Sequence, residues 1–196
     1  MTTGTRGNWL LAGAVRDRQT TDADWNFVGR TLIHGVFVRE VRNVPKGNGM
    51  VTEVFRRDWF DHEIEIDQVF QVLVESGCVS AWHAHAETTD RLFVNQGLMR
   101  IVLYDSRPDS PTHGLVNELV LGLHRPGLVV VPPRVWHGVQ NLLNRPSAVL
   151  NLPDRGYQYA SPDHWRLPAD TPLIPYRFQA ARPPSALTTG NVDDEI

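Results

Sequence analysis

The sequence predicts an all-β fold, either a sandwich or a barrel. Short runs of alternating apolar and polar residues recur along the chain, turn-forming residues separate them, and hardly any segment has the period of a helix. Strands of this kind bury one face each, so many of them in succession favour two packed sheets or one closed sheet. The length of 196 residues suits a single domain of ordinary size.

The strand-like runs extend from about residue 36 to residue 153. The first alternates over 36–44, stops at the turn sequence PKGNG and resumes over 50–55. The next run, IDQVFQVLVES, ends just before Gly77. Further runs follow in the order RLFVNQG, MRIVLYD, VNELVLG, GLVVVPP, WHGVQNLL and SAVLNLP.

The two ends of the chain differ from this body. Residues 1–30 are mixed in character, and we expect an arm or a short helix that packs on the domain. The last stretch, RPPSALTTGNVDDEI, is small, polar and acidic, which predicts a flexible tail over residues 179–196. One domain is therefore expected over residues 31–178.

Composition and charge exclude several classes of function. The net charge of −3 and a pI near 6.2 leave no broad basic surface for a phosphate backbone, so we expect no nucleic-acid partner. The N-terminus lacks the basic region and the long apolar run of a secretory signal or a membrane span, so we expect no membrane partner. A single cysteine, Cys78, fits a reducing compartment, and we expect a cytoplasmic protein.

Two histidines stand one residue apart in the segment SGCVSAWHAHAETTDRLFVNQG. On an extended strand the side chains at i and i+2 share a face, so His83 and His85 point the same way. Gly77 lies six residues before His83, Asp90 lies five after His85, and Gly97 lies seven after Asp90.

This spacing resembles the first cupin motif, G(X)5HXH(X)3-4E(X)6G, with Asp90 in the glutamate place. The later segment GLVVVPPRVWHGVQN resembles the second cupin motif through Pro132, His137 and Asn141, and departs from it at Arg134. The resemblance implies a cupin double-stranded β-helix, or jelly roll. Four side chains would then converge inside the barrel as ligands of Fe(II), Mn(II), Ni(II) or Zn(II), namely His83, His85, Asp90 and His137.

A second resemblance covers roughly residues 36–178. The segment LYDSRPDSPTHGLVNELVL resembles the D-x-R-x-x-S-P-T-x-G run of the dTDP-4-dehydrorhamnose 3,5-epimerase family. Around it, SAWH falls where that family has Arg-Gly-Leu-His, and VWHGV falls where it has Phe-Ala-His-Gly. Downstream, YASPDHWRLPADTPLIPY resembles the closing region of the family.

That resemblance implies an enzyme that inverts carbons beside the ketone of a nucleotide-linked 4-keto-6-deoxy sugar and needs no metal. His83 would be the base that removes the proton next to the ketone, and Asp170 would orient it. Arg91 would stand in the place of a lysine that steadies the enolate oxygen. A neutral imidazole suits general-base work near neutral pH, and a fixed cation suits the developing charge.

The chain departs from the family at three positions. Ser80 replaces an arginine that contacts substrate, and His85 replaces a residue that is usually glutamine. The tyrosine that donates a proton falls near Asn151, whose amide cannot do so. Tyr157 or Tyr159 would have to substitute for it, although both also suit aromatic packing in a loop.

The sequence offers further candidates for contact with substrate. Arg56, Arg107 and Asn151 are candidate substrate-binding residues, the two arginines because a guanidinium binds a diphosphate through two hydrogen bonds. The remaining histidines are interpreted as members of hydrogen-bond networks or as solvent-facing, and they are His34, His62, His113, His124 and His164.

Three functions remain open, with the epimerase acting on a nucleotide sugar as the leading hypothesis. The alternatives are a metal-dependent cupin enzyme, either an oxygenase or an isomerase, and a cupin that binds sugar nucleotides without catalysis. The first two compete for His83, because a nitrogen that coordinates a metal has no lone pair for a proton. We also expect a homodimer, since sheet edges need cover and the related epimerases pair through their N-terminal strands.

Overall fold

The structure is a computed structural model that describes residues 9–23 and 28–178. The chain separates into two compact units, Met1–Thr31 and Leu32–Ile196. The described residues of the first unit contain no helix, so the short helix that we considered is not formed there. The predicted tail over 179–196 lies outside the described residues.

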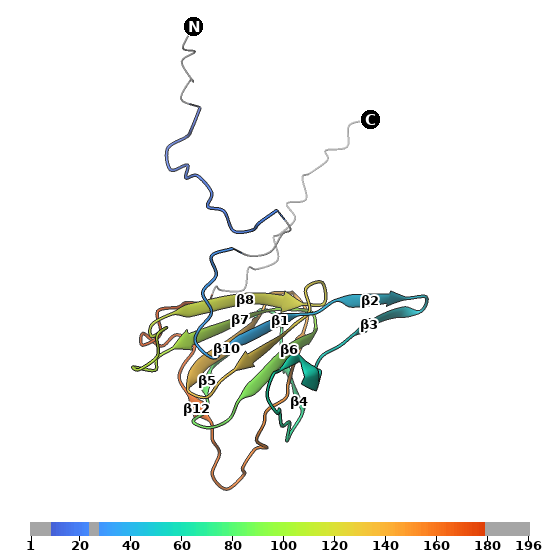
Figure 1. Cartoon of the computed structure of the whole chain (residues 1–196). Helices are drawn as coiled ribbons and strands as arrows, with labels where there is room; N and C mark the ends of the chain where they lie inside the picture. The colour runs from blue at the N-terminus through green and yellow to red at the C-terminus, as the bar shows by residue number, and fades with distance from the viewer. Residues whose placement is uncertain (1–8, 24–27, 179–196) are drawn as a thin grey trace, which may run out of the picture. The chain divides into compact units, whose positions relative to one another are not determined.

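Strands dominate the second unit (Figure 1). In chain order the elements are β1 (Phe37–Glu40), β2 (Asn43–Lys46), β3 (Gly49–Thr52), the 3₁₀ turn η1 (Arg57–Trp59), β4 (Phe70–Val74), β5 (Val79–Ala84), β6 (Asp90–Gln96), β7 (Leu98–Asp105), β8 (Val116–Gly122), β9 (Gly127–Val131), β10 (Val135–Asn141), β11 (Ser147–Asn151) and β12 (Trp165–Arg166). Across the described ranges, no helix has the length and apolar character needed to span a bilayer.

Two five-stranded sheets form the body of the fold, with the orders β1-β9-β6-β11-β4 and β12-β5-β10-β7-β8. Strands β2 and β3 form a separate hairpin. All the pairings between neighbouring strands are antiparallel. The predicted all-β jelly roll is confirmed.

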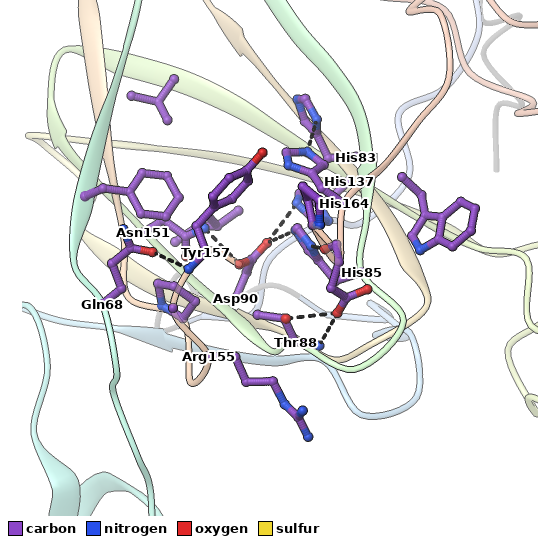
Figure 2. A pocket seen from close by; sticks show the side chains of 18 of the residues that line it. Gln68, His83, His85, Thr88, Asp90, His137, Asn151, Arg155, Tyr157 and His164 are labelled. Carbon is purple, nitrogen blue, oxygen red and sulfur yellow. Dashed lines mark hydrogen bonds and ion pairs between the residues drawn. The ribbon is translucent and has the colours of Figure 1, made fainter. Parts of the chain in front are cut away.

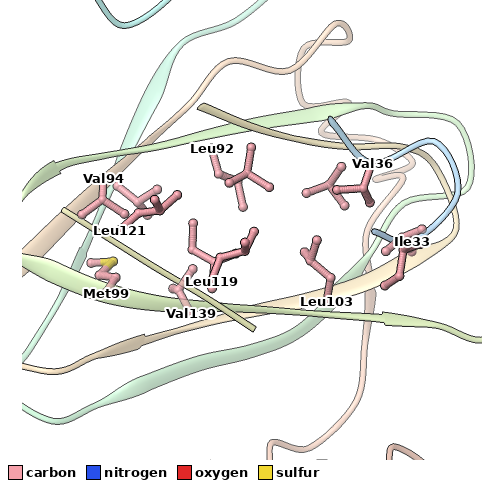
Figure 3. Close-up of a cluster of buried hydrophobic side chains, with 14 of the residues drawn as sticks. Ile33, Val36, Leu92, Val94, Met99, Leu103, Leu119, Leu121 and Val139 are labelled. Atoms are coloured by element: carbon pink, nitrogen blue, oxygen red, sulfur yellow. The ribbon is translucent and has the colours of Figure 1, made fainter. Parts of the chain in front are cut away.

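The core lies between the two sheets, as Figure 3 shows. Strand alternation places Met99, Ile101 and Leu103 of β7 on one inner face, and all three are fully buried. Leu92 and Val94 of β6 face them from the other sheet. Burying a side chain of this size stabilises the fold by about 1.5–3 kcal/mol, so this cluster contributes much of the stability of the jelly roll.

The outer face of one sheet is also covered. Phe93, Leu128 and Val130 point outward from β6 and β9 and are buried beneath a segment that includes Phe55 and Phe60. The cover explains why GLVVV of β9 is a continuous apolar run that is buried at every position.

Asn141 is the last residue of β10 and joins three neighbouring strand ends. Its side chain is 1% exposed, and its amide oxygen accepts hydrogen bonds from the backbone N–H of Leu143 (2.9 Å) and the hydroxyl of Ser147 (2.7 Å). Its amide nitrogen lies 2.7–3.0 Å from three backbone carbonyl oxygens, those of Val74, Glu75 and Arg145. One amide therefore ties three strand ends together.

Replacing this amide should destabilise the protein. We expect Asn141→Ala to lower the free energy of unfolding by about 2–4 kcal/mol, because several buried backbone groups lose their partner. Urea unfolding followed by circular dichroism measures the change. The matched control is Asn95→Ala, which removes only an exposed hydrogen bond to Gln71 and should stay within about 0.5 kcal/mol of wild type. Equal effects of the two substitutions would contradict the assignment.

Candidate active site

A pocket of about 640 Å³ opens between the two sheets at one end of the jelly roll. Strands β4, β5, β6, β10 and β11 line it, together with residues 153–166, which lead from β11 to β12 and are called the return segment here. Figure 2 shows four histidines along one side of the pocket and Asn151 and Tyr157 on the other, with Asp90 between them.

A β-bulge in β5 turns both Ser80 and His83 toward the pocket. His137 of β10 pairs with His83, and Val139 pairs with Ser80, so β5 carries one extra residue between the two pairs. Without that residue, side chains three apart on a strand would face opposite sides. Ser80 and His83 instead both line the pocket.

Both ring nitrogens of His83 have partners. Nε2 lies 3.1 Å from the hydroxyl oxygen of Ser80, and Nδ1 lies 3.0 Å from Nε2 of His164 on the return segment. Burial, followed by the neighbouring charges of His137 and His164, lowers the pKa of His83 to about 3. The ring is therefore neutral at neutral pH.

His85, Asp90 and His137 form a second cluster beside His83. The Oδ2 atom of Asp90 lies 3.1 Å from Nε2 of His85 and 3.0 Å from Nε2 of His137. These distances are in hydrogen-bonding range, but this buried oxygen has no well-aligned donor, so the two contacts are close ion-pair contacts without hydrogen-bond geometry. Burial works against the ionised form of Asp90, but the two imidazoles outweigh it and hold the pKa of Asp90 well below its usual range.

Backbone carbonyls orient the two imidazoles of this cluster. Nδ1 of His85 contacts the carbonyl oxygen of Asp163, and Nδ1 of His137 lies 3.2 Å from that of Val135. A carbonyl oxygen only accepts, so both Nδ1 atoms carry the proton. The Nε2 atoms are then the ones directed at Asp90.

The side chain of Asp163 fixes the loop that follows β5. Its carboxylate accepts hydrogen bonds from the backbone N–H groups of Ala86 (2.6 Å), Glu87 (2.9 Å) and Thr88 (3.0 Å) and from the Thr88 hydroxyl (3.0 Å). Burial raises the pKa of Asp163, but these bonds outweigh it and lower the pKa to about 2. The return segment is thereby attached to the loop that carries His85.

The return segment is also held at the mouth of the pocket. The backbone N–H of Gly156 donates to the carboxylate of Asp67 (2.6 Å), and that of Tyr157 donates to the side-chain oxygen of Gln68 (3.0 Å). These bonds place the Tyr157 side chain on the pocket wall, where it is 49% exposed. Tyr159 is 88% exposed and does not line the pocket, although its ring meets the edge of Tyr157.

The structure does not bring Arg91 or Asp170 to His83. Arg91 follows Asp90 on β6 and therefore points to the opposite face, where it lines a different cavity and donates to the carbonyl oxygen of Leu152 (3.3 Å). Asp170 is exposed and lies outside the pocket lining. The group that contacts Nδ1 of His83 is the imidazole of His164.

Among the predicted substrate-binding residues, only Asn151 lines the pocket. Its amide donates to the Oδ1 atom of Asp90 at 2.8 Å. Arg56 is exposed and pairs with Glu53 and Asp58. The arginines that line the pocket are Arg155 and Arg166, which the sequence analysis did not select.

Two residues that line the pocket, His164 and Asp163, were not selected from the sequence. His164, interpreted as a member of a hydrogen-bond network or a solvent-facing residue, does belong to a network, but its partner there is His83 of the pocket, which the sequence did not reveal. Asp163 was not considered at all. Neither residue stands at a motif spacing from His83, because both reach the site through the pairing of the two-residue strand β12 with β5.

Arg107 belongs to a structural brace outside the pocket. Its guanidinium donates to the carboxylate of Asp105 through Nε (2.8 Å) and Nη2 (2.9 Å), and Nη2 also donates to the carbonyl oxygen of His34 (2.8 Å). The hydroxyls of Ser110 (2.5 Å) and Thr112 (2.7 Å) donate to the same carboxylate. The Ser-Pro-Thr run therefore supports the fold.

An antiparallel jelly roll with a histidine-lined pocket at its open end defines a cupin-type enzyme. The family model described as dTDP-4-dehydrorhamnose 3,5-epimerase matches residues 30–172. The chain belongs to the dTDP-4-dehydrorhamnose 3,5-epimerase family. As predicted, it is an enzyme of the sugar-nucleotide epimerase class, and the two alternative functions are not favoured.

The chain is similar to proteins from an archaeon and from bacteria. The chain is 36% identical over 139 residues to the "Probable low-salt glycan biosynthesis epimerase Agl13" of Haloferax volcanii, covering 70% of this chain and 89% of that protein. It is 28% identical over 148 residues to the "Spore coat polysaccharide biosynthesis protein SpsL" of Bacillus subtilis, covering 75% and 97%. Among solved structures, a dTDP sugar isomerase from Desulfovibrio desulfuricans superposes with a TM-score of 0.69 at 29% identity, covering 74% and 92%.

The Asp105 brace predicts a pH-dependent loss of stability. Burial raises the pKa of Asp105, but the bonds from Arg107, Ser110 and Thr112 outweigh it and hold the pKa below its usual range. A depressed folded-state pKa stabilises the fold above the unfolded pKa of about 4, and this contribution is lost as the pH falls below it.

We therefore expect Asp105→Asn to be less stable than wild type at pH 7, with the difference shrinking below about pH 4. Urea unfolding between neutral and acidic pH tests this, with the exposed Asp109→Asn as the control. A difference that stays constant with pH would show that the charge of Asp105 does not matter.

Proposed function

We propose that the protein inverts a carbon next to the ketone of a nucleotide-linked 4-keto-6-deoxy sugar, with His83 as the base. The observation that carries this proposal is the position of the His83 ring, which lines the pocket with one nitrogen on Ser80 and the other on His164. The C–H bond beside the ketone breaks, its electron pair moves to the ketone oxygen as an enolate, and the proton passes to Nε2. A proton delivered to the opposite face completes the inversion.

His164 takes the orienting role that the family resemblance gave to Asp170. When Nδ1–H of His83 donates to Nε2 of His164, the lone pair on Nε2 of His83 faces the pocket, where the Ser80 hydroxyl donates to it. A substrate C–H group that takes the place of the Ser80 hydroxyl beside Nε2 of His83 would face the lone pair of a neutral base. His164 is thus a positioning residue in this proposal.

The pocket also suits the charged part of a sugar nucleotide. Arg155 and Arg166 stand on its wall, and a guanidinium binds a phosphate through two parallel hydrogen bonds. Arg155 now pairs with Glu87 at 2.7 Å near the surface, and a diphosphate is a stronger partner. We assign the diphosphate to these two arginines in place of Arg56 and Arg107.

Tyr157 is the residue we propose as the proton donor. Tyr157 lines the pocket across from the histidines (Figure 2). Tyr159 is not among the residues that line the pocket. A donor opposite His83 is what inversion requires, because the proton must return to the other face of the ring.

A homodimer in the cytoplasm completes the proposal. Strand β1 lies at the edge of its sheet, and the β2–β3 hairpin beside it in Figure 1 exposes Val44, Met50 and Val51 to about half of their surface. An unpaired strand edge and exposed apolar side chains favour association with a second copy. A chain with one cysteine also suits a reducing compartment.

Deuterium exchange tests the base. In D₂O, the wild-type protein should introduce deuterium at C3 or C5 of dTDP-4-keto-6-deoxyglucose, as followed by NMR. We expect His83→Ala to slow this exchange by about 100-fold or more, since a positioned base contributes that much. The control is His62→Ala, an exposed histidine outside the pocket. Exchange that is equally fast in the His83 variant would sink the proposal.

A pair of tyrosine variants tests the donor. In Tyr157→Phe we expect formation of the inverted sugar to fall by about 100-fold, while deuterium still enters at the same carbon because His83 can return a proton to its own face. Tyr159→Phe should behave as wild type. Product stereochemistry and deuterium content, measured in one NMR experiment, separate the two steps, and normal inversion by Tyr157→Phe would exclude it as the donor.

A further inference from the structure

Three donor atoms converge in the pocket beside His83. One nitrogen each from His85 and His137 and one oxygen from Asp90 all lie within 4.8 Å of one another. The side chain of Asp90 is 3% exposed, that of His137 is 8% exposed and that of His85 is 14% exposed. Asp90 begins β6 in one sheet, His137 belongs to β10 in the other, and His85 directly follows β5, so the fold itself brings the cluster together.

The hydrogen bonds around the cluster direct its lone pairs inward. Because Nδ1 of His85 and of His137 each contact a backbone carbonyl, Nε2 is the nitrogen of each ring that is directed at Asp90, and it offers a lone pair to a metal ion once it has lost its proton. Asp90 is oriented as well, since its Oδ1 atom accepts the amide of Asn151. Imidazoles that donate their other N–H to a carbonyl, beside an oriented carboxylate, are typical of metal-binding residues.

Protons alone do not satisfy this cluster. If both rings were protonated on Nε2, two N–H groups would share the Oδ2 atom of Asp90, yet this oxygen has no aligned donor and no access to solvent. An unpaired buried charge of this kind is costly. One cation at the point where the three donors converge satisfies all of them at once.

We propose that His85, Asp90 and His137 bind a divalent first-row transition metal. Two imidazoles and one carboxylate suit Fe(II), Mn(II), Ni(II), Co(II) or Zn(II) and leave positions open for substrate or water. His83 is outside the donor set, because its ring nitrogens contact Ser80 and His164. The base and the ion therefore occupy different side chains and do not compete.

The position of the ion accounts for a missing charge. Arg91, expected to steady the enolate, faces away from the pocket, and the two arginines that line the pocket, Arg155 and Arg166, are assigned to the diphosphate. A divalent ion held by Asp90 and its two histidines supplies positive charge beside His83, where a ketone oxygen is polarised. This second half of the proposal rests on the proposed epimerase function, whereas the metal site itself does not.

Metal content tests the site. Protein stripped with a chelator and then dialysed against Mn²⁺ or Zn²⁺ should retain about one ion per chain by elemental analysis. Asp90→Asn and His137→Ala should each lose at least about 90% of it, while His83→Ala and His62→Ala should retain it. Circular dichroism and thermal melting of each metal-free variant exclude unfolding as the cause of a loss.

Cobalt substitution gives a second readout. Co²⁺ added to the stripped wild-type protein should produce visible absorption bands that are absent in Asp90→Asn and present in His83→Ala. A wild-type protein that takes up no Mn²⁺, Zn²⁺ or Co²⁺ would overturn the proposal. Equal uptake by wild type and Asp90→Asn, or loss of uptake in His83→Ala as complete as in Asp90→Asn, would overturn the assigned ligands.

Deuterium exchange with stripped and reloaded protein separates this proposal from the proposed function. We expect stripping to slow exchange into dTDP-4-keto-6-deoxyglucose by about 100-fold or more and reloading to restore it. Full exchange by the stripped protein would show that the ion takes no part in proton abstraction, and the assignment of His83 as the base would stand. Binding of one ion per chain with no exchange in any form would overturn the epimerase function and leave the metal site standing.

Discussion

The pairing of β5 with β10 is the constraint on which the pocket depends. It sets His83 opposite His137, and the bulge between this pair and the next turns Ser80 to the same side. A slip of one residue would turn every side chain of β5 to the opposite face of the sheet. His83 would then leave the pocket, and Trp82, which is now fully buried on the other face, would enter it. Pairing of β10 with β7 over seven positions holds that register, because it continues the packed core.

A second set of contacts converts two sheets into one site. Asp90 begins β6 in one sheet, and His137 belongs to β10 in the other, so their 3.0 Å contact spans the interior of the jelly roll. Asp163 adds a connection through the backbone, since its carboxylate holds residues 86–88 while its carbonyl oxygen receives His85. At this end of the fold, polar contacts join the two sheets, and at the other end the apolar core joins them.

The features that follow from a local sequence pattern, namely the strands and the motif histidines, were predictable. Contacts between segments far apart in the chain, such as that of His164 with His83, were not predictable. Alternation revealed the strands, and motif spacing brought His85, Asp90 and His137 together. His164 reaches His83 only because β12 pairs with β5 across about 80 residues, which no local pattern encodes. Arg91 is different, because strand parity already forbids neighbours such as Asp90 and Arg91 from facing the same pocket.

The return segment forms a wall of the pocket that is held from three distant parts of the chain. It is attached to residues 67–68 at the mouth, to residues 86–88 through Asp163 and to β5 through β12. The three sets of anchoring residues lie far apart in the chain, but together they hold one wall of the pocket in place. The position of this wall therefore depends on residues from three separate parts of the sequence, and transplanting the return segment into another chain would require all three anchors to be transplanted with it.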